Sequence, residues 1–225
     1  MRRAYHIDMP VSRQETRIDA AAERGPRART RRLMLATASR LMQAGVTPSV
    51  SEVAEAAGVS RATAYRYFPS QAALVQAVVG EGLGPILGWR SDSTDAVERI
   101  ADLLDVAMPR IEAFEATFKA ALKLSIEQWA QRHAGTLGTE PQFNRGRRVE
   151  LLKNALAPLK CKLSEPEFER LVQALSLVFG VEVLIVLKDI WGLDSAETLS
   201  VAQWVARSLV EAAVRQGESG EDGEK

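Results

Sequence analysis

Residues 60–68, SRATAYRYF, carry hydroxyl and guanidinium groups at the spacing of one short helix. Ala64 and Phe68 lie one turn apart, so we expect both to pack inward with Val59. Arg66 and its polar neighbours are then turned away from the core. An arginine on such a face can donate two hydrogen bonds to guanine in the major groove, and Tyr or Thr hydroxyls can hold phosphates. The pattern therefore favours recognition of double-stranded DNA.

A second short helix and a sharp turn precede this segment and would position it. Apolar residues recur at i, i+3, i+4 and i+7 and give that helix one apolar side: Val50, Val53, Ala54 and Ala57. Gly58 has no Cβ and can adopt the left-handed conformation that ends a helix. Ser60 is a natural N-cap for the helix that follows. Residues 47–68 are therefore predicted to form two helices joined by a tight turn.

The run SEVAEAAGVSRATAYRYFPSQAAL resembles the DNA-binding domain of TetR-type transcriptional regulators, whose core reads A-x-x-A-G-V-S-x-x-T-x-Y-x-Y-F. The likeness covers roughly residues 31–79, about a fifth of the chain. In that family the positions of Arg61, Ala62 and Arg66 tend to face bases, and those of Thr63, Tyr65 and Tyr67 tend to face phosphates. The residues that we assign to DNA contact are Ser49, Ser51, Ser60, Arg61, Ala62, Thr63, Tyr65, Arg66, Tyr67 and Gln71.

Charge is divided unevenly along a chain whose net charge is zero. Residues 1–80 contain twelve Arg, no Lys and six acids, a net charge of +6, and the remainder, with 17 basic and 23 acidic residues, carries −6. A basic head on an acidic body suits a protein that touches DNA with one part only, although chance clustering of solvated charges gives the same pattern. Gln71 stands where the family usually has a Lys that pairs with phosphate, which removes one charge contact.

Four regions are predicted along the chain: an Arg-rich flexible arm (1–28), a helix-turn-helix DNA-binding domain (29–79), a helical effector-binding and dimerisation domain (80–216) and an acidic disordered tail (217–225). Regular helix is expected from about Thr30. Arginines of the arm, such as Arg24 and Arg27, can enter a narrow minor groove or merely attract phosphate, and both readings stay open.

The predicted fold class is all-α, because residues 80–216 show helical spacing and no alternating strand pattern. A glycine cluster and Pro85 predict that the helix after residue 70 ends or kinks near Gly84. Pro109 is predicted to end the helix that begins near Val97. A single long helix, apolar on nearly every side, is predicted from Leu171 to Ile190.

A helix that is apolar all round must be covered all round, and in a body of this size a partner subunit is the economical cover. The resemblance implies the same arrangement, because the family dimerises by pairing its last two helices into a four-helix bundle. The residues assigned to the dimer interface are Phe179, Val183, Leu187, Val201, Trp204, Val205 and Ser208.

The resemblance also implies an effector cavity enclosed by the helices of the body. The residues assigned to it are Phe114, Phe118, Trp129, His133 and Phe179, and the same set equally describes an all-helical core. Residues Arg145, Arg147 and Arg148 offer charge for an anionic ligand, but a solvated basic loop is the preferred interpretation.

No residue pattern indicates catalysis, a cofactor or a metal. His6 and His133 are isolated, and the single Cys161 excludes an internal disulfide and agrees with a reducing cytoplasm. The apolar run from Leu175 to Leu187 contains Glu182 and is too short for a bilayer, which requires ~20 residues.

The sequence therefore predicts a cytoplasmic, ligand-responsive transcriptional regulator, a repressor that binds operator DNA as a homodimer. The alternative is a helix-turn-helix interaction module that dimerises and contacts protein partners without an effector.

Overall fold

The computed structural model describes residues 25–138 and 146–221, and every regular element within these ranges is helical. The all-α fold class is thus confirmed. The head contains α2 (Pro26–Gln43), α3 (Val50–Ala56), α4 (Arg61–Tyr67) and α5 (Gln71–Leu87). The body contains α6 (Ala96–Ala113), α7 (Glu115–His133), α8 (Arg147–Ala155), the 3-10 turn η1 (Ala157–Leu159), α9 (Glu165–Leu175), α10 (Val181–Leu184), the π-helix η2 (Ile185–Ile190) and α11 (Ser195–Glu221).

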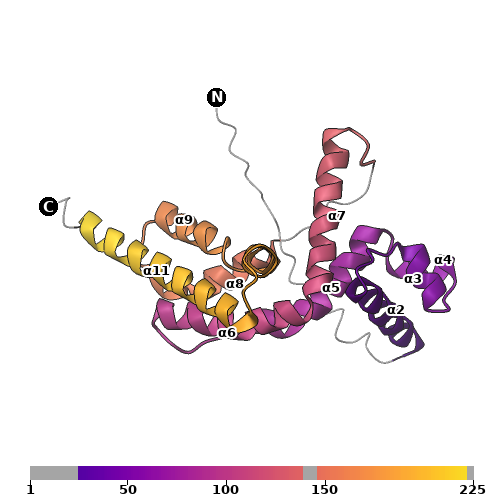
Figure 1. Ribbon diagram of the computed structural model, residues 1–225, viewed down its shortest axis with the longest axis horizontal. Coiled ribbons are helices and arrows are strands. Elements are labelled where there is room, and N and C mark those ends of the chain that lie inside the picture. The colour runs from indigo at the N-terminus through magenta and orange to yellow at the C-terminus, as the bar shows by residue number, and fades with distance from the viewer. Residues whose placement is uncertain (1–24, 139–145, 222–225) are drawn as a thin grey trace.

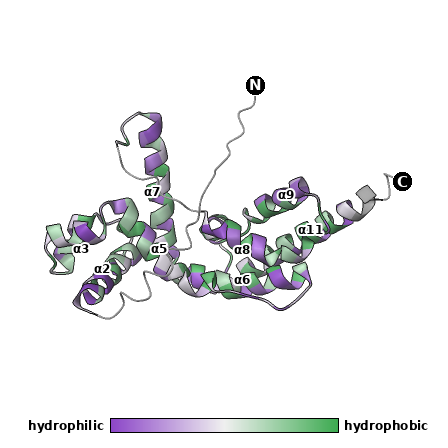
Figure 2. Cartoon of the chain, turned by 180° about the vertical axis from the view of Figure 1, so that it is seen from behind, coloured by the Kyte–Doolittle hydropathy of each residue, from purple (hydrophilic) through white to green (hydrophobic). Residues whose placement is uncertain are grey.

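The molecule is elongated, with the head at one end and the bundle of α6, α8, α9 and α11 at the other (Figure 1). Helix α7 stands across the junction, where it packs against α2 and α5 of the head and against α6 and α10 of the body. Its far end projects away from both and is largely hydrophilic (Figure 2). Helices α5, α6 and α7 therefore connect the two regions.

Both ends of the regular structure differ from the prediction. Helix α2 begins at Pro26 and not near Thr30, because a proline in the first turn costs no hydrogen bond. Helix α11 continues to Glu221, so the predicted tail from residue 217 begins too early. Residues 1–24 of the predicted arm and residues 222–225 of the tail lie outside the described residues.

The prediction that Pro109 ends its helix was wrong, and the helix predicted to end or kink near Gly84 ends three residues later. Helix α5 continues through Pro85 to Leu87, and α6 continues through Pro109 to Ala113. Pro85 cannot donate to the carbonyl of Glu81. Arg110 of α6 donates to that oxygen over 3.4 Å and to the carbonyl of Gly82 over 2.9 Å. A side chain distant in sequence thus replaces the missing backbone donor.

The single helix predicted over Leu171–Ile190 was also wrong. Helix α9 ends at Leu175, and Gly180 adopts a φ of 129° before α10 begins. A Cβ at Gly180 would lie 3.1 Å from the guanidinium carbon of Arg148, which occupies the space beside the turn. The apolar run is therefore divided among α9, α10 and η2, and other elements of the same chain cover part of it.

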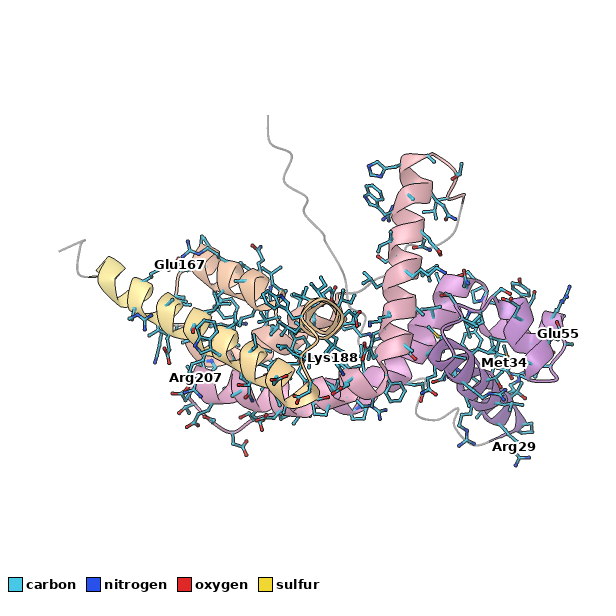
Figure 3. The ribbon with its side chains drawn as sticks, viewed as in Figure 1. Arg29, Met34, Glu55, Glu167, Lys188 and Arg207 are labelled. Carbon is cyan, nitrogen blue, oxygen red and sulfur yellow. The ribbon has the colours of Figure 1, made fainter. Side chains whose placement is uncertain are left out.

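Two polar clusters join elements of the body. Arg99 of α6, 8% exposed, donates to the carbonyls of Ser91, Ser93, Asn154 and Ala155 over 2.5 to 3.0 Å. Lys188 of η2 pairs with Glu112 of α6, which also accepts a hydrogen bond from the Ser195 hydroxyl. Lys188 lies at the centre of the body in Figure 3.

Candidate nucleic-acid interface

The turn between α3 and α4 has the geometry that the sequence predicts. Gly58 has a φ of 65°, and the Val59 N–H donates to the Ala54 carbonyl over 2.9 Å. The Ser60 hydroxyl accepts from the Thr63 N–H over 3.2 Å and caps α4. These contacts close the turn and fix the direction of α4 relative to α3.

The first turns of α3 are fixed by a second cap. Ser49 and Glu52 form a capping box, in which each side chain accepts from the other residue's backbone N–H. The Ser49 backbone N–H, and then its hydroxyl, hold the pKa of Glu52 below its ordinary value. Ser49 is half-buried, and its side chain already caps α3. Its backbone leads into the first helix of the helix-turn-helix.

The outer face of α4 is exposed. Ala64 and Phe68 are buried in the core of the head, with exposures of 0% and 3%. Arg61, Ala62 and Arg66 are all exposed. They lie on the side of α4 that was predicted from the sequence to face away from the core. The structure thus brings the three residues predicted to face bases onto one free surface.

The hydroxyl-bearing residues flank that surface. The Tyr65 hydroxyl lies 3.3 Å from the Ser51 hydroxyl and links α4 to α3. The Arg66 guanidinium lies 5.7 Å from the centre of the Tyr67 ring, which supports its position. Thr63 is half-buried and accepts a hydrogen bond from Ser60 over 2.9 Å. Ser60, Tyr65 and Tyr67 are therefore held by neighbours within the motif.

Gln71 has a structural role that the sequence did not reveal. Its amide nitrogen donates to the carbonyls of Thr47 and Pro48 over 3.1 and 3.2 Å. The side chain is half-buried and ties the start of α5 to the segment that leads into α3. Gln71 thus holds α5 to the helix-turn-helix, a contact between residues more than twenty positions apart that local patterns do not indicate.

Exposed arginines continue along α2. Arg27, Arg29, Arg31, Arg32 and Arg40 are all exposed. Figure 3 shows Arg29 directed away from the head at the outer end of α2, whereas Met34 lies inside it. The described part of the predicted arm is therefore the start of a helix whose outer side is cationic.

Two of the five residues assigned to an effector pocket line a cavity. Phe118 and Phe179 face a cavity of about 70 Å³ between α5, α7 and α8. Phe114 packs against α5 instead, 3.3 Å from the position of a Cβ at Gly82. Trp129 and His133 are exposed at the far end of α7, with ring centres 4.2 Å apart.

Arg147 and Arg148 also line this cavity, so the prediction that they stand in a loop was wrong, although Arg147 is exposed to solvent as predicted. They form the first turn of α8, which places both at the cavity and not in a loop. Arg145 lies outside the described residues.

The residues assigned to dimerisation divide into buried and exposed groups. Phe179 and Val183 are buried within the subunit, at 3% and 5% exposure. Leu187, Val201 and Val205 are half-buried, and Ser208 is exposed. Trp204 on α11 is 69% exposed. Four exposed apolar residues that lie between α9 and α11 were not assigned from the sequence: Leu177, Val186, Ile190 and Trp191.

No group of His, Cys, Asp and Glu side chains among the described residues could hold a metal ion. None of the helices in that part of the chain combines the length and apolar character needed to cross a bilayer.

Comparison with known proteins points to one family of regulators. Residues 34–78 match the family of bacterial regulatory proteins described as the tetR family. The fold is similar to that in the crystal structure of a TetR transcriptional regulator from Rhodococcus sp. RHA1, with a TM-score of 0.53 and 18% sequence identity. That similarity covers 83% of this chain and 97% of the other, and at this identity it concerns the fold. A search of curated proteins found no match.

Proposed function

We propose that this chain, a TetR-family regulator by its N-terminal domain, binds operator DNA as a homodimer and represses transcription until a small molecule occupies its body. The observation that carries the proposal is the exposed face of α4, where Arg61, Ala62 and Arg66 lie together on a capped and braced helix. Proteins of this family are transcription regulators. The proposed function requires recognition of DNA and of a small molecule, and it needs no catalytic group.

On DNA, α4 enters the major groove. Arg61 and Arg66 donate to guanine N7 and O6, and the small Ala62 allows close approach or contacts a thymine methyl. The hydroxyls of Thr63, Tyr65 and Tyr67, with Ser49, Ser51 and Ser60 around them, serve the phosphates. The exposed arginines of α2 add attraction to the backbone.

A homodimer places two heads on one operator, at half-sites separated by about 34–36 Å or a multiple of it. The exposed Trp204, Trp191 and Ile190 support dimerisation, because monomers rarely leave large apolar side chains of neighbouring elements in water. Leu187, Val201 and Val205 border that surface as half-buried residues. The dimer acts where the genome lies, in the cytoplasm.

Helix α5 couples the two regions. Its residues Val79 and Leu83 line the cavity, while Gln71 at its start is bonded to the segment before α3. A ligand that displaces α5 therefore changes the position of the head. Control requires different ligand affinities in the two states, typically ~1–3 kcal/mol of coupling.

The test begins by selecting bound sequences from random DNA and measuring affinity across a salt series. Phosphate contacts give a steep loss of affinity as salt rises. The double variant Tyr65→Ala/Arg66→Ala is expected to lose specific binding, by about a hundredfold if each lost contact costs ~1–3 kcal/mol. Arg207→Ala on α11 is the matched control and should bind normally.

Unchanged operator affinity in the double variant would reject the DNA-reading role of α4. It would favour the alternative, an interaction module that contacts protein partners. A single subunit at all concentrations in ultracentrifugation would reject the homodimer.

A further inference from the structure

We propose that the effector is an amphipathic carboxylic acid, whose apolar part occupies the cavity between α5, α7 and α8 and whose carboxylate binds Arg147 and Arg148. This inference rests on the proposed function in one respect, that the body of the chain binds an effector. It adds the chemical class of that effector and the residues that select it.

The walls of the cavity set the apolar half of the ligand. Most lining residues are apolar: Val79, Leu83, Ile111, Phe118, Ala121, Leu151, Phe179 and Val181. A sugar phosphate or nucleotide would leave hydroxyl groups against these side chains without hydrogen-bond partners, which is costly. An alkyl or aromatic body fits such walls, since it gains by leaving water.

The charged residues of the cavity determine the polar group of the ligand. Its charged lining residues are two arginines, with no carboxylate among the lining side chains. Arg147 is exposed and has no ion pair or hydrogen bond within the described part of the chain. Gln76 of α5, half-buried, offers an amide that is likewise unpaired within that part. A carboxylate satisfies a guanidinium through two parallel hydrogen bonds and can accept a further one from an amide.

Arg148 fastens one wall of the cavity. Its Nη2 donates to both carboxylate oxygens of Glu182 over 2.9 and 2.8 Å, and its Nη1 donates to the Ser176 carbonyl over 3.2 Å. These bonds tie α8 to the turn between α9 and α10. That turn carries Phe179 and Gly180 to the cavity.

The cavity must widen to admit a ligand, because 70 Å³ is far below the ~300–1,000 Å³ of typical ligand pockets. A ligand carboxylate can take the place of Glu182 on Arg148. The guanidinium then exchanges one carboxylate for another and is never left unpaired, which would be the costly outcome. The exchange frees the turn at Phe179, so the wall moves outward as the ligand enters.

The test uses three probes with the same six-carbon chain, namely hexanoate, hexan-1-ol and hexylammonium, titrated calorimetrically into the full-length protein without DNA. Hexanoate is expected to bind about tenfold or more tightly than the other two, since it alone pairs with a guanidinium. Arg147→Gln should weaken hexanoate about tenfold and leave hexan-1-ol unchanged. Arg207→Gln, an arginine remote from the cavity, should change neither.

Any one of these results would overturn the inference: equal or tighter binding of the alcohol or the amine, no effect of Arg147→Gln, or no binding of hexanoate. Leu83→Trp, which fills the cavity, should abolish hexanoate binding. Binding that persists in that variant, with its helical circular dichroism intact, would place the acid elsewhere and also overturn the inference.

Operator binding is measured separately by fluorescence anisotropy, so the two proposals can fail independently. If the acid does not bind but the operator does, the effector class is wrong and the DNA-binding role stands. If the acid binds but no operator is found, the cavity assignment stands and the proposed regulatory function fails.

Discussion

The head and the body are both helical, but different interactions hold them. In the head, Ser49, Ser60 and Ser70 each accept a hydrogen bond from a backbone N–H three residues later. In the body, Arg99 reaches carbonyls 55 and 56 residues away, and Lys188 pairs with a carboxylate 76 residues away. Local caps also start α6 and α9 of the body, at Asp95 and Ser164, so the body differs from the head chiefly in the polar contacts that it adds between elements far apart in sequence.

This difference suits the two tasks proposed for them. A helix that contacts bases must keep one orientation. The caps at Ser49 and Ser60 fix the orientation of α4 through contacts within the helix-turn-helix alone. Polar ties between distant elements can be exchanged for ligand contacts, as proposed for Arg148 and Glu182. The body can therefore change its packing while the head keeps its shape.

The largest effect is expected when a tie of the body is removed. Arg99→Met retains the length of the side chain but removes the donor to the buried carbonyl of Ala155 and the donors to the part-buried carbonyls of Asn154, Ser91 and Ser93. Each buried polar group left unpaired costs ~1–3 kcal/mol, so the free energy of unfolding should fall by about 3–5 kcal/mol. Urea denaturation followed by circular dichroism measures it.

Arg207→Met is the control, since Arg207 is exposed on α11 and substitutions at such sites change stability by about 0.5 kcal/mol or less. Equal losses in both variants would show that Arg99 does not join α6 to α8. Operator affinity per folded molecule should be unchanged in both variants, because the caps that fix α3, α4 and α5 lie within the head.

Two glycines with positive φ allow the two regions to be compared, and Gly180, at φ 129° and ψ −170°, lies in a backbone region essentially restricted to glycine, unlike Gly58. Gly58 has a φ of 65°. A Cβ at Gly58 meets nothing within 4 Å, whereas one at Gly180 lies 3.0 Å from a Glu182 oxygen and 3.1 Å from Arg148. Gly58→Ala should cost ~1 kcal/mol, and Gly180→Ala about 2 kcal/mol or more.

Thermal unfolding of the two glycine variants measures this difference. Gly180→Ala should also alter hexanoate binding, because it disturbs the residues that fasten the cavity wall. If Gly58→Ala lost more stability than Gly180→Ala, the side chains of Arg148 and Glu182 would not crowd the turn at Gly180 as described.

The same contrast explains what the sequence could predict. The turn at Gly58, the cap at Ser60 and the exposure of Arg66 follow from residues within a few positions of one another, so patterns in the sequence indicate them. The continuation of α5 through Pro85 depends on Arg110, and the role of Gln71 depends on Thr47 and Pro48. The cavity joins residues from α5 to Val181, and no local spacing places Arg147 beside Phe118.

A smaller effect is expected from a cap of the head. Ser60→Ala removes the acceptor of the Thr63 N–H at the start of α4, and loss of an N-cap typically costs ~1 kcal/mol. Hydrogen exchange should accelerate for amides of α3 and α4 and stay unchanged in α6 and α11. Ser208→Ala, whose hydroxyl bonds within α11, is the control and should leave exchange in the head unaltered. Faster exchange throughout the body after Ser60→Ala would mean that the two regions unfold as one unit.

The smallest effect concerns pH and the body alone. Hydrogen bonds from Lys188 and then Ser195 hold the pKa of Glu112 below its ordinary value of 4.5, and Glu112 in turn raises the pKa of Lys188 above 10.5. A lowered carboxyl pKa stabilises the folded state above pH 4.5, and this contribution disappears as pH falls through the folded pKa. The raised amine pKa contributes below pH 10.5 and is lost as pH rises through the folded value.

Glu112→Gln should therefore reduce the stability of the body by about 1 kcal/mol or less near pH 7, and the difference from the natural chain should shrink as pH falls through the folded pKa of Glu112, which lies below 4.5. Urea midpoints measured in steps from pH 7 down to about pH 2 follow it. Glu211→Gln removes an exposed ion pair to Arg215 on α11 and should show almost no difference at any of these values. If the Glu112→Gln difference persisted at the lowest pH, packing and not charge would account for the contact, because the protonated carboxyl group of Glu112 and the amide of the variant both lack the charge that attracts Lys188.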